Sequence, residues 1–206
     1  MIEGIAAGLI YSLTLYPGMV WLTKVGLAGN RRQVAAVGLA FWLSHIVWLL
    51  ISSCAVLLMI RNLSFLKMGI HIFAAFVLLY MARKFFLSRR VETLRDPHAL
   101  PGSGKLFWSA FKQSFAMPLR LPAAVAITTA TGVGGQELTV HSLSLLFFGI
   151  FLGITWWWGK FTLIGIFFVR RVERPTTIRS LNRLRTFCAY LSVALAGVSL
   201  IMIGGR

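Results

Sequence analysis

Acidic residues are scarce in this sequence. Its 206 residues include only five aspartates and glutamates against 21 lysines and arginines, which gives a formal net charge of +16. All five acids lie at or outside the ends of the apolar segments, namely Glu3, Glu92, Asp96, Glu137 and Glu173. No carboxylate within those segments is available to bind a divalent metal, so the sequence predicts no metal site there and argues against metal export.

Signatures of catalysis and of cofactor binding are also missing. The chain has no His-Glu-x-x-His pair, no nucleophile with a matched acid and base, and no nucleotide fingerprint. Gly102-Ser103-Gly104-Lys105 resembles the end of a phosphate-binding loop, but Leu106 takes the place of the required Ser or Thr, so we interpret it as a turn. Only two cysteines occur, both within apolar stretches. We therefore expect neither an enzyme nor a cofactor.

Apolar residues dominate the chain. They make up 58% of it, charged residues make up 13%, and the mean hydropathy is +0.80, far from the balance of a soluble domain. A helical crossing of a bilayer needs roughly 20 apolar residues, so this length predicts about six transmembrane helices and no separate soluble domain. The expected spans are Gly4–Leu22, Val34–Ile60, Leu66–Phe86, Leu106–Ala130, Leu143–Val169 and Phe187–Ile203.

The basic residues alternate between successive connections. The first, third and fifth connections are rich in Lys and Arg, whereas the second has only Arg61 and Lys67 and the fourth has none. Because Lys and Arg favour the cytoplasmic side, this pattern predicts that both termini lie outside, and short loops suit a bacterial inner membrane. The basic clusters form no continuous face, so we expect no nucleic acid among the partners.

The sequence predicts one membrane domain built of two halves. Residues 1–87 and 106–206 each hold three expected spans, and the connection 88–105, with its Pro and Gly, reads as a cytoplasmic loop. Weak likenesses relate the halves, including a polar segment ending in a proline at Pro17 and at Pro118. With three spans in each half, the two must insert in opposite orientations, as in the inverted repeats of many secondary transporters.

The layout resembles the lysine-exporter (LysE) family of bacterial amino-acid exporters over nearly the whole chain. Pro17-Gly18-Met19 stands where that family has Pro-Gly-Pro, and a turn at Gly29-Asn30-Arg31-Arg32 follows it. Met117-Pro118-Leu119 stands where the family has Asn-Pro-Lys, with the proline kept. The resemblance implies an exporter of amino acids or similar small solutes, driven by an ion gradient or the membrane potential, and includes Gly18 in the substrate site.

Three residues are candidates for the solute site on physical grounds. Pro17 and Pro118 interrupt matching spans, and the half-helix ends that result suit a carboxylate or an ammonium group, although each proline alone is also consistent with a packing kink. Arg120 lies roughly 20 Å of helix from either flank, near the bilayer middle. It therefore needs an interior partner such as a substrate carboxylate, unless it extends its side chain to the membrane surface.

Three further side chains lie deep in expected spans. Lys160 follows Trp156 by one helical turn, so we expect a cation–π contact and include both in the substrate site, with an interfacial aromatic belt as the alternative for the tryptophans. His45 is mid-span and of a type that titrates near neutral pH, which makes it a proton-coupling candidate. A histidine that only satisfies a neighbouring carbonyl or hydroxyl is the alternative.

Two Gly-xxx-Gly pairs, Gly4–Gly8 and Gly149–Gly153, predict close helix packing within one chain or between protomers, so a homodimer stays open. We expect a secondary exporter of amino-acid-like solutes, surrounded by lipid. Two alternatives are a membrane scaffold or accessory subunit without transport, and a membrane-embedded enzyme acting on lipid. The expected depth of His45 speaks against the enzyme.

Overall fold

The structure is a computed structural model that describes residues 1–14, 16–62, 66–94, 100–117, 119–133 and 139–204. In this part of the chain the regular secondary structure consists of eight α-helices, so the fold is all-α. The helices are α1 (Ile2–Leu13), α2 (Tyr16–Ala28), α3 (Arg31–Asn62), α4 (Leu66–Leu87), α5 (Ser103–Ala116), α6 (Arg120–Ala130), α7 (Val140–Phe167) and α8 (Arg174–Gly204).

Several of these helices have the length and composition of membrane spans. Helices α3, α4, α7 and α8 are each long and apolar enough to cross a membrane, and α1 with α2 makes a fifth crossing if the bent pair counts as one. Helices α5 and α6 have 14 and 11 residues, so each falls short of the roughly 20 residues that a crossing needs. The helices therefore indicate an integral membrane protein.

Two of the six expected spans, Gly4–Leu22 and Leu106–Ala130, are each divided into two helices, as the prolines within them led us to expect. The first divides into α1 and α2, bent by 65°. The second divides into α5 and α6 after Met117, whose backbone is extended at φ −66° and ψ 121°. Proline lacks an N–H group and disfavours helical geometry in the preceding residue, which explains breaks close to Pro17 and directly before Pro118 in the sequence.

The helices also extend into segments that the sequence predicted as connections. Helix α8 begins at Arg174 and not at Phe187, so most of the arginines of the expected fifth connection are helical. Arg83 and Lys84 belong to the last turns of α4, and Lys105 belongs to the first turn of α5. Arg and Lys have good helix propensity, and a span that is already helical continues past the apolar region without new nucleation.

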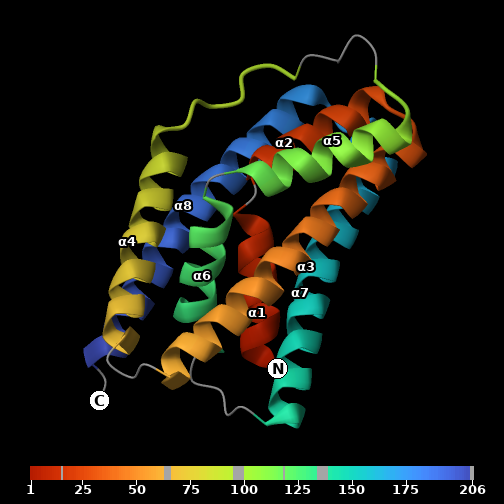
Figure 1. Cartoon of the computed structure of the whole chain (residues 1–206). Helices are drawn as coiled ribbons and strands as arrows, with labels where there is room; N and C mark the ends of the chain where they lie inside the picture. The colour runs from red at the N-terminus through yellow and green to blue at the C-terminus, as the bar shows by residue number, and fades with distance from the viewer. Residues whose placement is uncertain (15, 63–65, 95–99, 118, 134–138, 205–206) are drawn as a thin grey trace.

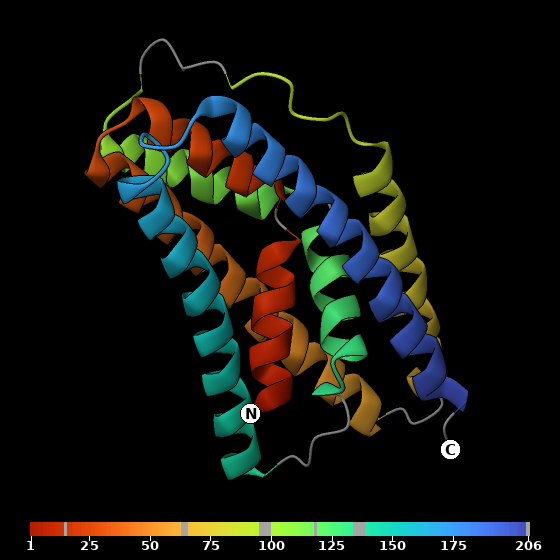
Figure 2. The same ribbon diagram turned by 180° about the vertical axis from the view of Figure 1, so that it is seen from behind.

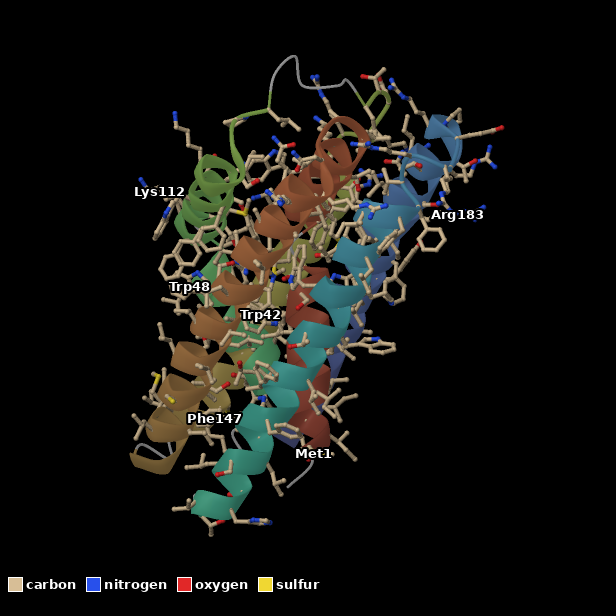
Figure 3. All side chains as sticks on the ribbon, turned by 90° about the vertical axis from the view of Figure 1, so that its right-hand side faces the viewer. Met1, Trp42, Trp48, Lys112, Phe147 and Arg183 are labelled. Carbon is tan, nitrogen blue, oxygen red and sulfur yellow. The ribbon has the colours of Figure 1, made fainter. Side chains whose placement is uncertain are left out.

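The basic connections gather at one end of the molecule. The α2–α3 turn, the start of the segment after α4 and the α7–α8 turn all lie at this end, whereas Met1 lies at the opposite end with the visible end of α8 (Figure 1). Lys112 and Arg183 lie toward the first end, and Met1 and Phe147 toward the other (Figure 3). We call the first end the basic end.

Helices α1 and α6 stand in the middle of the bundle, between the α4–α8 pair on one side and the α3–α7 pair on the other (Figures 1 and 2). Helix α1 packs along α7, α6 packs against α4 and α3, and α5 packs along α3. The two breaks are thereby enclosed by the long helices, which suits backbone groups that are not paired within a helix.

Glycines set the distance between α1 and α7. The backbones of Gly4 and Gly8 face those of Gly149 and Gly153, and a Cβ added at Gly8 would lie only 2.6 Å from the carbonyl oxygen of Ile150. The two Gly-xxx-Gly pairs predicted from the sequence therefore pack on one another within a single chain. These glycine faces are therefore already in contact within the chain, and they give no evidence for a contact between protomers.

Arg170 fastens the end of α2 to the α7–α8 turn. Its Nε donates to the carbonyl oxygen of Gly26 at 3.0 Å and its Nη2 to that of Gly29, so one guanidinium pairs two carbonyls at a helix C-terminus. We expect Arg170→Gln to lower the free energy of unfolding by about 1–3 kcal/mol. Thermal unfolding in detergent measures the effect, with Arg171→Gln as the charge-matched control. Equal stability of the two variants would contradict this role.

Candidate functional site

A cavity lies where the two helix breaks meet. One break contributes Thr14, Tyr16 and Pro17 to its wall, and the other contributes Met117, Leu119 and Arg120. Its volume of ≈ 160 Å³ is enough for on the order of ten water-sized molecules, so it suits a small solute better than a drug-sized one. We call it the central cavity.

The rest of the described wall comes mainly from α4. Met81, Lys84, Phe85 and Ser88 line the cavity from the last turns of that helix and the residue after it, which is the basic end. Together with Arg120, Lys84 gives the cavity two cationic side chains, and none of its described lining residues is an acid. The electrostatic preference of the cavity is therefore for a group that carries negative charge.

Arg120 is the first residue of α6 and is only 4% exposed. Its guanidinium carbon lies 4.3 Å from the ring centre of Tyr11, and the Tyr11 hydroxyl donates to the Arg120 carbonyl oxygen at 3.2 Å. Within the described residues, its Nε and Nη2 are buried without a hydrogen-bond partner. A buried guanidinium with unused donors is costly, and a carboxylate in the cavity would pair with it.

The start of α6 adds to this preference. The first N–H groups of a helix have no partner within it and form the positive end of its dipole. Because Arg120 occupies this position, its side-chain charge and the helix end act at the same place. At the other break, between α1 and α2, side chains satisfy carbonyl groups at the end of α1. The Thr14 hydroxyl donates to the Tyr11 carbonyl at 2.6 Å, and the Cys188 thiol donates to the Leu13 carbonyl at 3.2 Å.

His45 lies behind Tyr11 and does not line the central cavity. Its ring is fully buried, 5.1 Å from the Tyr11 ring and 5.0 Å from the Trp158 ring. Nδ1 must carry the proton, because its partner at 2.5 Å is the Phe41 carbonyl oxygen. Nε2 is buried without a partner among the described residues. His45 therefore satisfies one carbonyl, as the structural alternative requires, and keeps a second nitrogen, Nε2, without a partner among the described residues.

The structure brings some of the predicted site residues together and separates others. Pro17 and Arg120 both line the central cavity, whereas Gly18 is buried in the first turn of α2 and does not line it. Pro118 lies outside the described residues. A cavity therefore lies between the two breaks, with Pro17 and Arg120 both in its wall.

Lys160 and Trp156 lie away from this cavity. Both are exposed on α7, Trp156 by 67%. The Lys160 ammonium lies 4.9 Å from the ring centre of Trp157, so the expected cation–π contact forms with a different tryptophan. Trp157 is half-buried, and Trp158 is the fully buried one of the three, in contact with Phe41 and His45. The sequence could place three consecutive tryptophans in three directions but could not identify the inward one.

Three residues of the site were missed by the sequence analysis. Tyr11 belongs to the polar segment before Pro17, and Lys84 and Ser88 belong to a basic connection, so the sequence predicts no role in the site for any of them. The only indication of Tyr11 in the sequence is its character and place, because it is a polar aromatic residue six positions before Pro17. No signal in the sequence places the end of α4 beside the two breaks, because that contact depends on tertiary packing.

Comparison with known protein families, characterised proteins and solved structures gave no match. The function is therefore argued from the cavity itself. Among the described residues no three His, Cys, Asp or Glu side chains lie close enough together to bind a metal ion. The chemistry that the site offers is recognition by charge and hydrogen bonding, since its functional groups are a guanidinium, an ammonium, hydroxyls and helix ends.

Proposed function

We propose that the chain is a secondary transporter that exports amino acids or similar small zwitterionic or anionic solutes across a bacterial cytoplasmic membrane. The observation that carries the proposal is the Arg120 guanidinium in the wall of a cavity between two broken helices, with Nε and Nη2 buried and without a hydrogen-bond partner among the described residues. Retaining such a charge within a membrane protein is expensive, and intramembrane charges of this kind commonly mark a substrate path. Its role is to pair with the carboxylate of the solute.

The proposed architecture is two inverted halves, α1–α4 and α5–α8. The support for it is that contacts between the halves come in matching pairs. Helix α1 of the first half packs on α7 of the second, and α5 of the second half packs on α3 of the first. The remaining long helices pair as α3 with α7 and α4 with α8. A two-fold axis in the membrane plane relates such contacts. The two breaks then correspond to one another, and both contribute to the central cavity.

The proposed orientation puts the basic end in the cytoplasm and Met1 with the end of α8 outside, according to the distribution of Lys and Arg. The central cavity is then nearer to the cytoplasm, because Lys84 and Ser88 in its wall belong to the basic end of α4. Export is taken from the resemblance to the lysine-exporter family. His45 Nε2 is the proposed proton-coupling atom, and Tyr11 connects it to Arg120.

The first test is thermal unfolding of the detergent-purified protein with a panel of amino acids, small carboxylates and amines. A solute that binds only the folded state at 100 times its Kd raises the free energy of unfolding by about 2.7 kcal/mol. We expect a selective rise with a carboxylate-bearing solute and none with its amide analogue. Arg120→Gln should abolish the rise, whereas Lys160→Gln, which removes the same charge outside the cavity, should retain it.

Two results would count against the proposal. An amide that stabilises as well as its acid, or an Arg120→Gln variant that responds like the unmodified protein, would remove Arg120 as the carboxylate partner. A panel without any response would favour the scaffold. Once a solute is known, its release from preloaded proteoliposomes measures transport, and a variant His45→Asn should retain binding while losing the dependence of release on an imposed pH gradient.

A further inference from the structure

A second site lies outside the central cavity, in a groove of ≈ 680 Å³ at the basic end. It runs between the first turns of α8 and the segment after α4. Four arginines line it, against a single glutamate, Glu92: they are Arg90, Arg179, Arg183 and Arg185. We call it the arginine groove. It shares no lining residue with the central cavity, so the proposed transport site leaves it without a function.

The groove has a fixed wall. Asn182 accepts a hydrogen bond from the Val91 N–H and donates one to the Val91 carbonyl, both at 2.9 Å, which holds the segment after α4 against α8. Arg185 donates to the carbonyl oxygen of Ser88 and, at 3.3 Å, to its hydroxyl. The positions of the arginines are therefore set by packing between two parts of the chain far apart in sequence.

Arg185 has an unused hydrogen-bond donor in the wall of the groove. Arg185 is only 7% exposed, and its Nε has no hydrogen-bond partner within the described residues. Arg179 and Arg183 are exposed, one helical turn apart on the same face of α8, so their guanidinium groups project at the groove without an ion pair in the described chain. Arginines in such an arrangement suit the oxygens of a phosphate group.

The depth of the groove favours a lipid as the source of that phosphate. Arg183 precedes Phe187 by four residues, roughly 6 Å of helix, and Phe187 opens the apolar part of α8. Phe187 and Tyr190 are 53% and 63% exposed and continue the same face of the helix below Arg183. A headgroup phosphate in the groove would leave its acyl chain along these two rings, and basic pockets at this level commonly bind anionic lipids. Arg183 is at this end of α8 (Figure 3).

We propose that the arginine groove is a phosphate-binding site that takes the headgroup of an anionic phospholipid. The test measures binding to the purified full chain in a neutral detergent by native mass spectrometry and thermal unfolding. The probes are phosphatidylglycerol, phosphatidylcholine and inorganic phosphate. The test variant is R179Q/R183Q, in which both changed residues are exposed, and R83Q/R89Q is the control, because it loses the same charge at the same end outside the groove.

We expect phosphatidylglycerol to bind more tightly than phosphatidylcholine, and R179Q/R183Q to weaken its binding about tenfold or more while R83Q/R89Q does not. Inorganic phosphate that stabilises the protein, is sensitive to the same variant and competes with the lipid would support the phosphate site and assign a free phosphate as its ligand. Equal lipid and phosphate binding by R179Q/R183Q and the unmodified chain would overturn the proposal. Equal losses in both double variants would also overturn it, because they would show general charge attraction.

Discussion

Replacement of Gly8 by leucine is expected to prevent α1 from packing on α7 and to leave little folded protein. An added Cβ would lie 2.6 Å from the carbonyl oxygen of Ile150 and 3.0 Å from the backbone nitrogen of Ile154. Backbone atoms of a long helix cannot move aside as a flexible side chain can, so the two helices must separate. We expect a loss of about 3 kcal/mol or more. Size-exclusion chromatography and thermal unfolding in detergent measure it.

Gly159 offers the matched control on α7, because a Cβ added there meets no atom within 4 Å. Gly159→Leu should therefore give folded protein with a melting temperature close to that of the unmodified chain. If both substitutions are equally harmful, leucine at these positions acts through something other than the α1–α7 distance. If both are harmless, the close approach of the two helices does not limit the fold.

Replacement of Arg120 by methionine is expected to increase stability while it removes solute binding. Methionine has a similar length and no donors to satisfy, so the variant loses the cost of a buried guanidinium whose Nε and Nη2 have no partner in the part of the chain that the structure describes. Loss of the cation–π contact with Tyr11 offsets part of this gain. We expect a net rise of up to about 2 kcal/mol in the free energy of unfolding without solute. Thermal or denaturant unfolding measures it.

The sign of this change separates a functional charge from a structural one. A buried arginine that supports the fold destabilises the protein when it is removed, by about 3–5 kcal/mol. A destabilised Arg120→Met would therefore assign Arg120 to packing, whatever happens to binding. Tyr11→Leu is the companion variant, because it removes the ring over Arg120 and should lower stability.

The broken helices explain why such a charge is tolerated. The Arg120 guanidinium lies over the Tyr11 ring, and Arg120 lines the cavity between the breaks. The long helices lie around α1 and α6, which stand in the middle of the bundle (Figures 1 and 2). Arg120 is only 4% exposed, and a charge with so little contact with solvent acts more strongly on its neighbours.

Much of the fold could be predicted from the sequence, because bilayer thickness fixes the length of an apolar span and the alternation of basic connections fixes which ends lie together. The expected span Leu66–Phe86 lies within α4. The expected span Leu143–Val169 is close to the bounds of α7. The extent of α8 could not be predicted in this way, because the arginines before Phe187 have no apolar signal and are helical through propensity and packing.

The candidate site was predictable only in part. Prolines identify where a helix is interrupted, so the breaks near Pro17 and Pro118 and the unusual position of Arg120 follow from local chemistry. Lys160 shows where this reasoning ends. Its depth along α7 was predicted from spacing, but the direction of a side chain around a helix depends on which neighbours pack on each face, and α7 presents Lys160 to the outside.

The sequence alone determined that the chain forms apolar helices, that two of them carry a proline within the span, and that positive charge collects between alternate helices. These properties are local, since they follow from the solvation of each segment and from the geometry of single residues. Only the tertiary structure decided that α1 packs on α7 through glycine, that Tyr11 covers Arg120, and that the end of α4 completes the cavity. Contacts between residues far apart in sequence depend on the shapes of whole helices, which no single segment specifies.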